Sequence, residues 1–242
     1  MIAELLPPQV AVVDARGPLP GEALLPEEEP LVARAVARRR AEFTTVRTCA
    51  RRALAQLGLP AVPVLSGQRR EPLWPAGVVG SLTHCAGYRA AAVAWATDLV
   101  TVGIDAEPHD VLPDGVLVRV SLPDERVHLR QLPRGMHWDR LLFSAKESVY
   151  KAWYPLAQCW LGFEDARLHF RPGPDPARGT FTAELLVPGL PPVHGRQVSV
   201  LAGRYAVGDG LLATAVSLPA KDPCEGRSAA PLDGAGPVPA GT

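Results

Sequence analysis

The segment 138–160, WDRLLFSAKESVYKAWYPLAQCW, constrains the fold more than any other part of the chain. Read as a helix, it places on one side an apolar stripe formed by Leu142, Val149, Ala152 and Trp153. A neighbouring side carries, at four-residue intervals, Phe143, Glu147 and Lys151. We therefore predict a long helix with a core face and a second, chemical face. Pro155 is expected to end it, because proline lacks an amide hydrogen.

Lysine is scarce in this chain, which has three lysines against 22 arginines. Two of the three, Lys146 and Lys151, lie in the predicted helix on either side of Glu147. Lysine is a compact, flexible charge that suits phosphate oxygens, whereas arginine makes planar bidentate contacts. A glutamate followed four residues later by lysine can also be simple surface support worth ~0.3 kcal/mol. The bias in lysine use favours a phosphate-binding role for Lys146 and Lys151.

The composition is that of a globular protein and argues against several function classes. The 242 residues are 47% hydrophobic and 21% charged, with a formal net charge of zero, which gives no bulk attraction for nucleic acid or an anionic membrane. Residues 1–15 lack the basic start and apolar core of a signal peptide, so we expect a cytoplasmic protein that does not bind membranes. The cysteines form no C-x-x-C pair, which argues against a zinc site or disulfides; they are Cys49, Cys85, Cys159 and Cys224.

A pair of acidic residues follows the predicted strands of the first half, which are 78–83, 88–96 and 100–105. Asp105 and Glu107 are two residues apart at the end of the third strand, so their side chains project to the same face. Two such carboxylates repel each other unless a positive charge lies between them, and oxygen ligands of this kind suit Mg²⁺. Glu147 in the predicted helix would supply a third carboxylate.

An arginine-rich helical stretch runs from about residue 30 to Gly58 and contains Arg39, Phe43 and Arg47 at four-residue spacing. Arg39 and Arg47 could therefore converge on one polyanion. A solvated basic face is the alternative for these two residues, and the sequence leaves both open.

The chain reads as two similar halves of an α+β fold. Each half has a helix followed by strands that end in a glycine-turned hairpin, and residues 87–93 faintly resemble residues 210–216. The second half adds a short helix at 123–131 and strands at 163–170, 181–187, 197–207 and 211–218. We place the N-terminal half at 1–108, the C-terminal half at 109–219, and a disordered Pro-, Gly- and Ala-rich tail at 220–242.

The motif 103–107, GIDAE, and the motif 143–153, FSAKESVYKAW, together resemble the signature of the 4′-phosphopantetheinyl transferases. The likeness extends to the actinobacterial members related to the enterobactin and surfactin synthesis enzymes. It includes residues 39–47, 71–75, 80–85 and 160–164, and it covers roughly 30–218. The resemblance implies a pseudo-dimeric α+β fold of two similar halves, with the active site in the cleft between them.

The resemblance also implies site residues. Mg²⁺, or Mn²⁺ in its place, would be bound by Asp105, Glu107 and Glu147, with a metal-bound water at the backbone of Ala106. The implied coenzyme A contacts are Arg39, Arg47, Ser66, Gly67, Gln68, Arg69, Arg70, Glu71, Thr83, His84, Asp105, Lys146, Glu147, Lys151 and Leu161.

The implied reaction is transfer of 4′-phosphopantetheine from coenzyme A to a serine of an apo acyl, polyketide or peptidyl carrier protein, releasing 3′,5′-ADP. Glu147 would be the base and Lys151 would stabilise the developing charge. We expect a monomer, and the sequence does not indicate which carrier or pathway is served. Two other classes stay open: a coenzyme A sensor without transfer, and an RNA or DNA binder using residues 34–52, whose affinity would fall steeply with salt.

Overall fold

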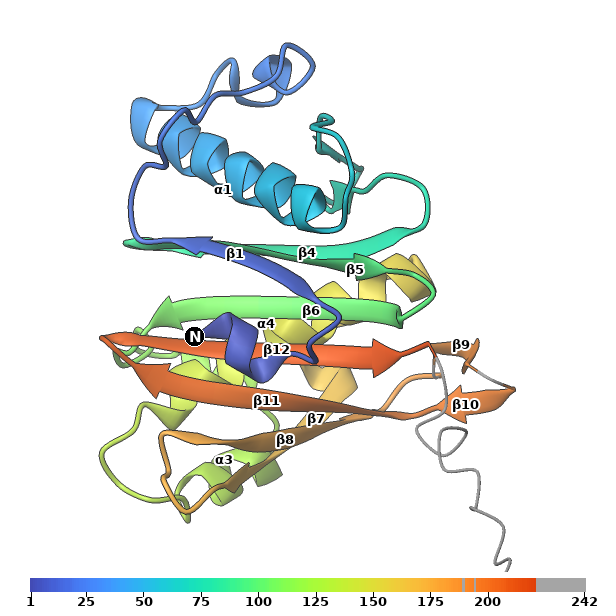
Figure 1. Cartoon of the computed structure of the whole chain (residues 1–242). Coiled ribbons are helices and arrows are strands. Elements are labelled where there is room, and N and C mark those ends of the chain that lie inside the picture. The colour runs from blue at the N-terminus through green and yellow to red at the C-terminus, as the bar shows by residue number, and fades with distance from the viewer. Residues whose placement is uncertain (189, 194, 221–242) are drawn as a thin grey trace, which may run out of the picture.

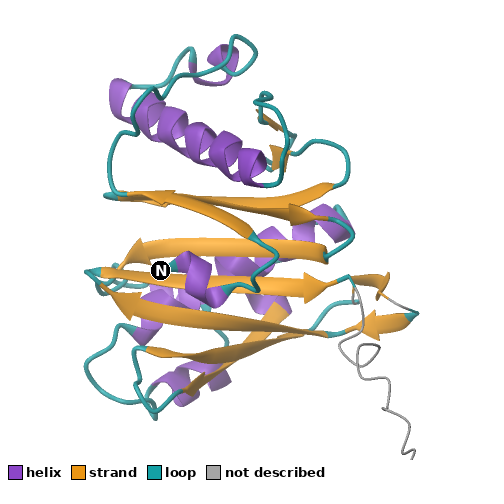
Figure 2. Ribbon diagram, in the orientation of Figure 1, coloured by secondary structure: helices purple, strands orange, loops and turns teal. Residues whose placement is uncertain are grey.

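The computed structural model describes residues 1–188, 190–193 and 195–220, and it contains two units in which a long helix packs on a β-sheet (Figures 1 and 2). In the first unit, helix α1 (Ala37–Gln56) covers a three-stranded sheet of order β1–β5–β4. In the second, helix α4 (Trp138–Ala157) covers a five-stranded sheet of order β6–β12–β11–β8–β7. Apart from Ala220, the tail predicted for 220–242 lies outside the described residues.

The strands of the first sheet are β1 (Ala11–Ala15), β4 (Val78–Cys85) and β5 (Tyr88–Trp95). Those of the second are β6 (Leu99–Pro108), β7 (Ala166–Pro172), β8 (Arg178–Leu185), β11 (Val200–Gly208) and β12 (Leu211–Pro219). Two small ribbons pair β2 (Leu65–Ser66) with β3 (Pro72–Leu73) and β9 (Leu190–Val193) with β10 (Arg196–Val198). The short helices are η1 (Ile2–Leu5), η2 (Glu29–Val32), α2 (Val116–Val120), α3 (Pro123–Leu129) and η3 (Phe163–Asp165).

Most of the predicted elements are confirmed. The hairpins β4–β5 and β11–β12 form where alternating residues flank a glycine-containing turn. The short helix predicted from Pro123 is α3. Strand β1 was not predicted, because its apolar residues follow a proline-rich entry that gives no strand period of its own; it pairs antiparallel with β5. No helix among the residues described here has the length and apolar character needed to cross a membrane.

Strand β6 joins the second sheet and not the first. It pairs with β12, with Asp105 opposite Thr214, although it follows β5 directly in the chain. Its other edge faces β4, where the Ile104 N–H donates to Ser81 Oγ and the Ala106 N–H donates to Thr83 Oγ1, both at 3.1 Å. We call this line of side-chain contacts between β4 and β6 the seam. The predicted boundary at 108/109 therefore does not coincide with the division between the two sheets.

Helix α4 lies unusually close to β6. A Cβ on Gly103 would fall 2.0 Å from the Ser148 carbonyl oxygen, so only glycine allows this approach. Two residues earlier in β6, Thr101 Oγ1 donates to the Ala152 carbonyl at 2.8 Å. The predicted apolar stripe of α4 is confirmed as fully buried at Leu142, Val149 and Ala152. This close packing fixes how far the chemical face of α4 stands from Asp105.

The predicted end of the central helix at Pro155 is wrong by two residues. The helix continues to Ala157 with Pro155 inside its last turn, and Gln158 follows in the left-handed conformation at φ 51°. A proline this close to the end of the helix removes a single internal hydrogen bond. After it, the Gln158 N–H still donates to the Tyr154 carbonyl at 2.9 Å.

Candidate active site

A cleft of about 1060 Å³ is lined by residues of α1, the β2–β3 ribbon, β4 and α4. It brings together ten of the predicted site residues: Arg39, Arg47, Ser66, Gly67, Arg69, Arg70, Glu71, His84, Glu147 and Lys151. Residues more than 100 positions apart in the chain thus meet at one opening. The cleft holds an excess of cationic over acidic groups from these predicted positions, which suits a polyanionic ligand.

Arg47 is a buried cation that faces this cleft with only 4% of its surface exposed. Its Nη2 donates to Ser66 Oγ at 3.0 Å and its guanidinium lies 4.2 Å from the centroid of the Phe43 ring. Within the described residues it forms no ion pair with a carboxylate, and its Nε has no hydrogen-bond partner. Burial lowers the pKa of Arg47 to about 10, which still leaves it charged at neutral pH. A buried positive charge without a counter-ion among the described residues is costly, so this position suits an anionic ligand.

Arg39 and His84 form a second cationic group at the cleft. One Nη1 of Arg39 contacts His84 Nε2, so the imidazole accepts a hydrogen bond and is neutral in this arrangement. Desolvation and the neighbouring Arg39 both lower the pKa of His84. A bound phosphate could take the place of the Arg39 contact and favour the charged imidazole.

The turn between β2 and β3 presents backbone groups to the cleft. The Gly67 N–H donates to the Glu71 carbonyl at 2.8 Å, and the Arg69 N–H donates to the Glu71 carboxylate at 2.8 Å. A Cβ on Gly67 would lie 2.0 Å from Glu71 Oε1, so the fold of this turn requires glycine. The guanidinium of Arg69 lies 6.0 Å from the ring centroid of Trp160, which follows the end of α4. Gln68 is exposed, and unlike Gly67 and Arg69 it does not line the cleft.

The carboxylate of Asp105 lies at the point where the two sheets and α4 meet. Its Oδ1 accepts from Lys151 Nζ at 2.7 Å and from Thr83 Oγ1 at 3.2 Å. Lys151 Nζ also donates to the Ile104 carbonyl at 3.1 Å. Thr83 itself is buried, does not line the cleft and contacts Asp105, while its predicted contact with the nucleotide stays a prediction.

The predicted carboxylates Glu147 and Glu107 both have raised pKa values. Burial raises the pKa of Glu147, with a further contribution from the charge of Asp105, while Lys151 opposes it. Burial and Asp105 likewise raise the pKa of Glu107, and Arg140 opposes the shift through an ion pair of 3.1 Å. Mutual repulsion with Asp105 thus contributes to the shift at both glutamates.

A three-carboxylate metal site is not assembled as predicted. In the described parts of the chain, no group of three or more His, Cys, Asp or Glu side chains is placed to hold a metal ion. Lys151 binds Asp105 and Arg140 binds Glu107 instead. The donor set nevertheless fits a divalent cation, because Asp105 Oδ2 is buried and has no hydrogen-bond partner among described residues. The Ala106 N–H, between the two acids, is used by Thr83.

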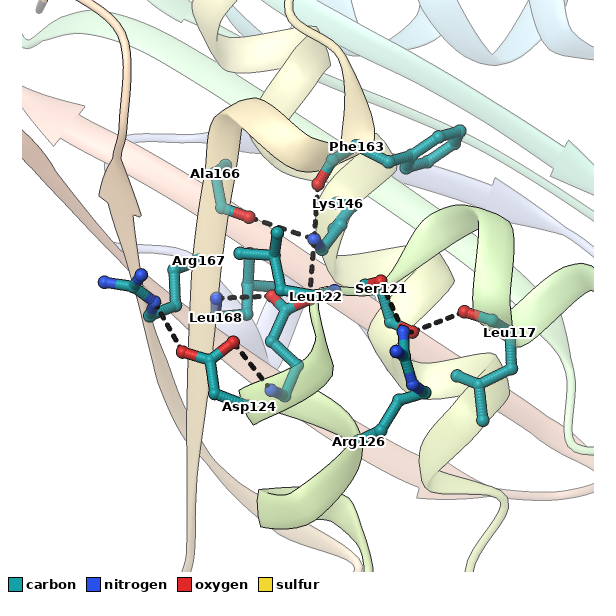
Figure 3. A network of polar contacts seen from close by, with 11 residues as sticks. Leu117, Ser121, Leu122, Asp124, Arg126, Lys146, Phe163, Ala166, Arg167 and Leu168 are labelled. Carbon is teal, nitrogen blue, oxygen red and sulfur yellow. Dashed lines mark hydrogen bonds and ion pairs between the residues drawn. The ribbon is translucent and has the colours of Figure 1, made fainter.

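Lys146, predicted to bind phosphate, does not line the main cleft but lines a smaller cavity beside Glu147. Figure 3 shows its ammonium surrounded by protein groups, and it is 4% exposed. Its donors bind the Glu125 carboxylate at 2.8 Å, the Phe163 carbonyl at 2.5 Å and the Ala166 carbonyl at 2.9 Å. An ammonium group has three donors, so none is left for a ligand. Lys146 therefore has a structural role.

The network around Lys146 also closes one side of the second sheet. Glu125 Oε1 accepts from the Leu168 N–H at 2.7 Å, and His128 Nε2 accepts from the Phe170 N–H at 3.0 Å. Both acceptors come from α3, which lies along β7. The side chains of α3 thus bind the backbone of the edge strand β7.

Leu161 lies apart from the main cleft. It is buried and lines a smaller cavity of about 120 Å³, whose lining includes Glu147, Tyr150, Trp160 and Phe163. Glu147 and Tyr150 line both spaces, so the smaller cavity is adjacent to the cleft.

Most of the arginines of the α1 region are engaged within the protein. Arg51 pairs with the fully buried Glu28 at 2.6 Å, Arg38 pairs with Glu42 at 3.1 Å, and Arg52 donates to the Pro20 carbonyl at 2.6 Å. The contacts of Arg51 and Arg52 hold the N-terminal loop on α1. Few arginines of this region are therefore available to bind a nucleic acid. Arg39 and Arg47 line the cleft.

One residue with a clear part in the site was not predicted. Arg140 binds Glu107 Oε2 and also donates to the carbonyls of Asp110 and Val111, at 3.2 and 2.7 Å. It thereby ties the first turn of α4 to the end of β6. Its place seven residues before Glu147, two helical turns back, was the only signal available in the sequence.

Comparison with known proteins places these features in context. Two family models match, the 4′-phosphopantetheinyl transferase N-terminal domain at residues 27–94 and the 4′-phosphopantetheinyl transferase superfamily at residues 101–189. The 4′-phosphopantetheinyl transferase PptT of Mycobacterium tuberculosis is 51% identical over 223 residues, covering 90% of this chain and 98% of the relative. Svp of Streptomyces mobaraensis is 54% identical over 91% of this chain and 90% of its own. Enterobactin synthase component D of Salmonella typhi is 39% identical over 48% of each chain.

Proposed function

The chain belongs to the 4′-phosphopantetheinyl transferase superfamily, and from that premise we propose that it transfers 4′-phosphopantetheine from coenzyme A to a serine of an apo acyl or peptidyl carrier protein. The serine oxygen forms the new bond to phosphorus, the bond to the departing 3′,5′-ADP breaks, and the serine proton passes to a base. The observation that carries this proposal is the buried Arg47, which faces the cleft without a carboxylate partner among described residues. The two helix-on-sheet units would be the halves of a pseudo-dimer, with the cleft between them.

Coenzyme A would lie along the cleft with its phosphates at the cationic groups. Arg47, Arg39, His84 and Lys151 all line the cleft. The pantetheine arm is uncharged, and the smaller cavity beside Glu147 has aromatic walls at Tyr150, Trp160 and Phe163 that suit it. Leu161 contributes to that cavity, which supports its predicted contact with coenzyme A.

The chemistry assigned to the chain's own groups follows from their places. Glu147 lines the cleft with a raised pKa, which suits a base that accepts the serine proton. Lys151 holds Asp105 Oδ1 and places a positive charge beside it. Mg²⁺, or Mn²⁺, would be held by Asp105, Glu107 and Glu147, and when bound it would neutralise charge on the pyrophosphate. Glu107 would have to exchange its ion pair with Arg140 for such a contact.

The direct test is to incubate the full chain with coenzyme A, Mg²⁺ and a panel of apo carrier proteins, followed by intact mass measurement. We expect the mass of at least one carrier to rise by one phosphopantetheine group, and 3′,5′-ADP to appear in equal amount. The same carriers loaded by a transferase of known activity show that the panel is competent. If that enzyme loads the panel and this chain loads none of it, the proposed function is wrong.

Arg47→Ala is expected to weaken coenzyme A binding by ~1.5–3 kcal/mol, or roughly 10- to 150-fold, because a charge-assisted contact to phosphate is lost. Arg52→Ala is the matched control, since Arg52 lies on the same helix but binds the Pro20 carbonyl. Isothermal titration calorimetry with both variants measures the difference. Equal affinities for Arg47→Ala and the wild type would remove Arg47 from the binding site.

Coenzyme A binding is expected to take up a proton at His84. The pKa of His84 is lowered in the free protein by desolvation and by Arg39, and a bound phosphate would raise it. The contribution of His84 to coenzyme A affinity is then greatest at low pH, and it is lost as the pH rises through the pKa of His84 in the bound state. Calorimetry in buffers of different ionisation enthalpy measures the uptake, and His84→Gln should abolish it. Uptake that persists unchanged in His84→Gln would assign the proton to another group.

A further inference from the structure

We propose that Thr83 is a positioning residue that orients the Asp105 carboxylate, fixing one oxygen and leaving the other free to bind a divalent cation. The inference rests on the proposed function for its biological meaning, but its geometry is independent of it. Thr83 belongs to β4 in the first sheet and Asp105 to β6 in the second. The contact therefore crosses the seam and links the first unit directly to the carboxylate.

The hydroxyl of Thr83 is held in a single hydrogen-bonding direction. It is 2% exposed and accepts the Ala106 N–H at 3.1 Å, and it contacts Asp105 Oδ1 at 3.2 Å. A hydroxyl has one hydrogen to donate, and the carboxylate can only accept. The hydrogen therefore points to Asp105, while the lone pair faces the backbone. Both bonds are buried, so neither competes with water.

The two oxygens of Asp105 are not equivalent as a result. Oδ1 accepts from both Thr83 and Lys151, whereas Oδ2 is buried and has no hydrogen-bond partner within the residues described. Leaving a carboxylate oxygen buried without a partner is costly, so such an atom calls for an explanation. A cation bound at Oδ2 would supply the missing partner. Two donors on Oδ1 would hold the carboxylate plane in place for it.

Thr83 also connects this carboxylate to the cleft. The next residue in β4, His84, lines the cleft and contacts Arg39 of α1. Successive residues of a strand point to opposite faces, so Thr83 points to β6 and His84 to the proposed nucleotide site. One stretch of β4 thus places the anion-binding histidine and the group that orients Asp105.

Ser81 provides an internal control for the seam itself. It is 3% exposed, and its Oγ accepts the Ile104 N–H at 3.1 Å, as Thr83 does for Ala106. Among the residues that the structure describes, Ser81 makes no hydrogen bond to a carboxylate. Ser81→Ala and Thr83→Val each remove one hydroxyl that accepts a backbone N–H of β6. Only Thr83→Val also removes a hydrogen bond to Asp105.

The experiment compares Mn²⁺ affinity of the full chain in four forms: wild type, Thr83→Val, Thr83→Ser and Ser81→Ala. Titration calorimetry with Mn²⁺ as the probe needs neither carrier nor turnover. We expect Thr83→Val to weaken Mn²⁺ binding by roughly 10- to 100-fold, the range for loss of a group that orients a metal ligand. Thr83→Ser keeps the hydroxyl and should bind within about threefold of wild type, as should Ser81→Ala. In transfer assays, Thr83→Val should lower kcat and leave the KM for coenzyme A nearly unchanged.

The outcomes separate this inference from the proposed function. Wild-type Mn²⁺ affinity in Thr83→Val, an equal loss in Ser81→Ala, or no Mn²⁺ binding by the wild type would each overturn the role of Thr83. If Thr83→Val does not fold, Thr83→Ala gives the same test, with thermal melting to show that it folds. A wild-type chain that binds Mn²⁺ with the expected variant pattern but loads no carrier would reject the proposed function alone.

Discussion

Glu147→Gln is expected to lower the rate of carrier loading by ~100- to 10,000-fold, the range for loss of a general base. The substitution keeps the shape of the side chain and removes its ability to take the serine proton. Glu147 projects from α4 into the cleft, four residues from Lys151 on the same helix face. Burial and the charge of Asp105 raise its pKa, which makes it a stronger base than an ordinary surface glutamate.

Steady-state rates at saturating Mg²⁺ and coenzyme A measure this effect, with Glu184→Gln as the matched control. Glu184 lies on β8 and pairs with the exposed Arg167, so its loss should leave the rate unchanged. The pH profile gives a second signature. The rate should fall on the acid side as the base becomes protonated. A Glu147→Gln enzyme of wild-type speed would exclude this glutamate as the base.

Lys146→Met is expected to reduce the free energy of unfolding by about 3–5 kcal/mol, because it leaves the Glu125 carboxylate buried without its counter-ion. The two backbone carbonyls that Lys146 binds, those of Phe163 and Ala166, also lose their donor. If Lys146 instead bound the pyrophosphate, stability would be nearly unchanged and coenzyme A affinity would fall. The two roles therefore predict opposite patterns.

Urea unfolding of the full chain decides between them. Arg167→Met is the control, since Arg167 pairs with Asp124 and Glu184 at the surface and such pairs contribute at most about 1 kcal/mol. Combining Lys146→Met with Glu125→Gln should recover part of the lost stability, because the unpaired charge is removed. Equal losses for Lys146→Met and Arg167→Met would contradict the structural role.

The features predicted from local sequence were those whose partners are close in the chain. The two faces of α4 follow from the helical period, and the β4–β5 and β11–β12 hairpins follow from alternation and turn residues. The cleft also gathers Glu147 with Arg39 and Arg47, two cations whose spacing and charge pointed to a polyanion. A period of three to four residues indicates which side of a helix faces the core, and the fold bears this out.

The features that were missed depend on contacts between distant residues. The phosphate role predicted for Lys146 came from the bias in lysine use, which gives no sign of its buried partner Glu125 in a different helix 21 positions away. Strand β6 pairs with β12 across more than 100 residues, which no local period can show. The same limit applies to Thr83, whose hydroxyl meets Asp105 only because β4 and β6 lie side by side. Charge and spacing in the sequence do not reveal which donors are already used inside the protein.

The side-chain cover along β7 has a consequence for how copies of this protein meet. An open edge strand offers a row of N–H groups on which another chain can add a strand, and this is a common start of aggregation. At β7 the N–H groups of Leu168 and Phe170 are already bound by Glu125 and His128 of α3. An incoming strand would have to displace a buried carboxylate that is also held by Lys146. The ion pair that stabilises the fold thereby also protects this sheet edge from intermolecular strand pairing.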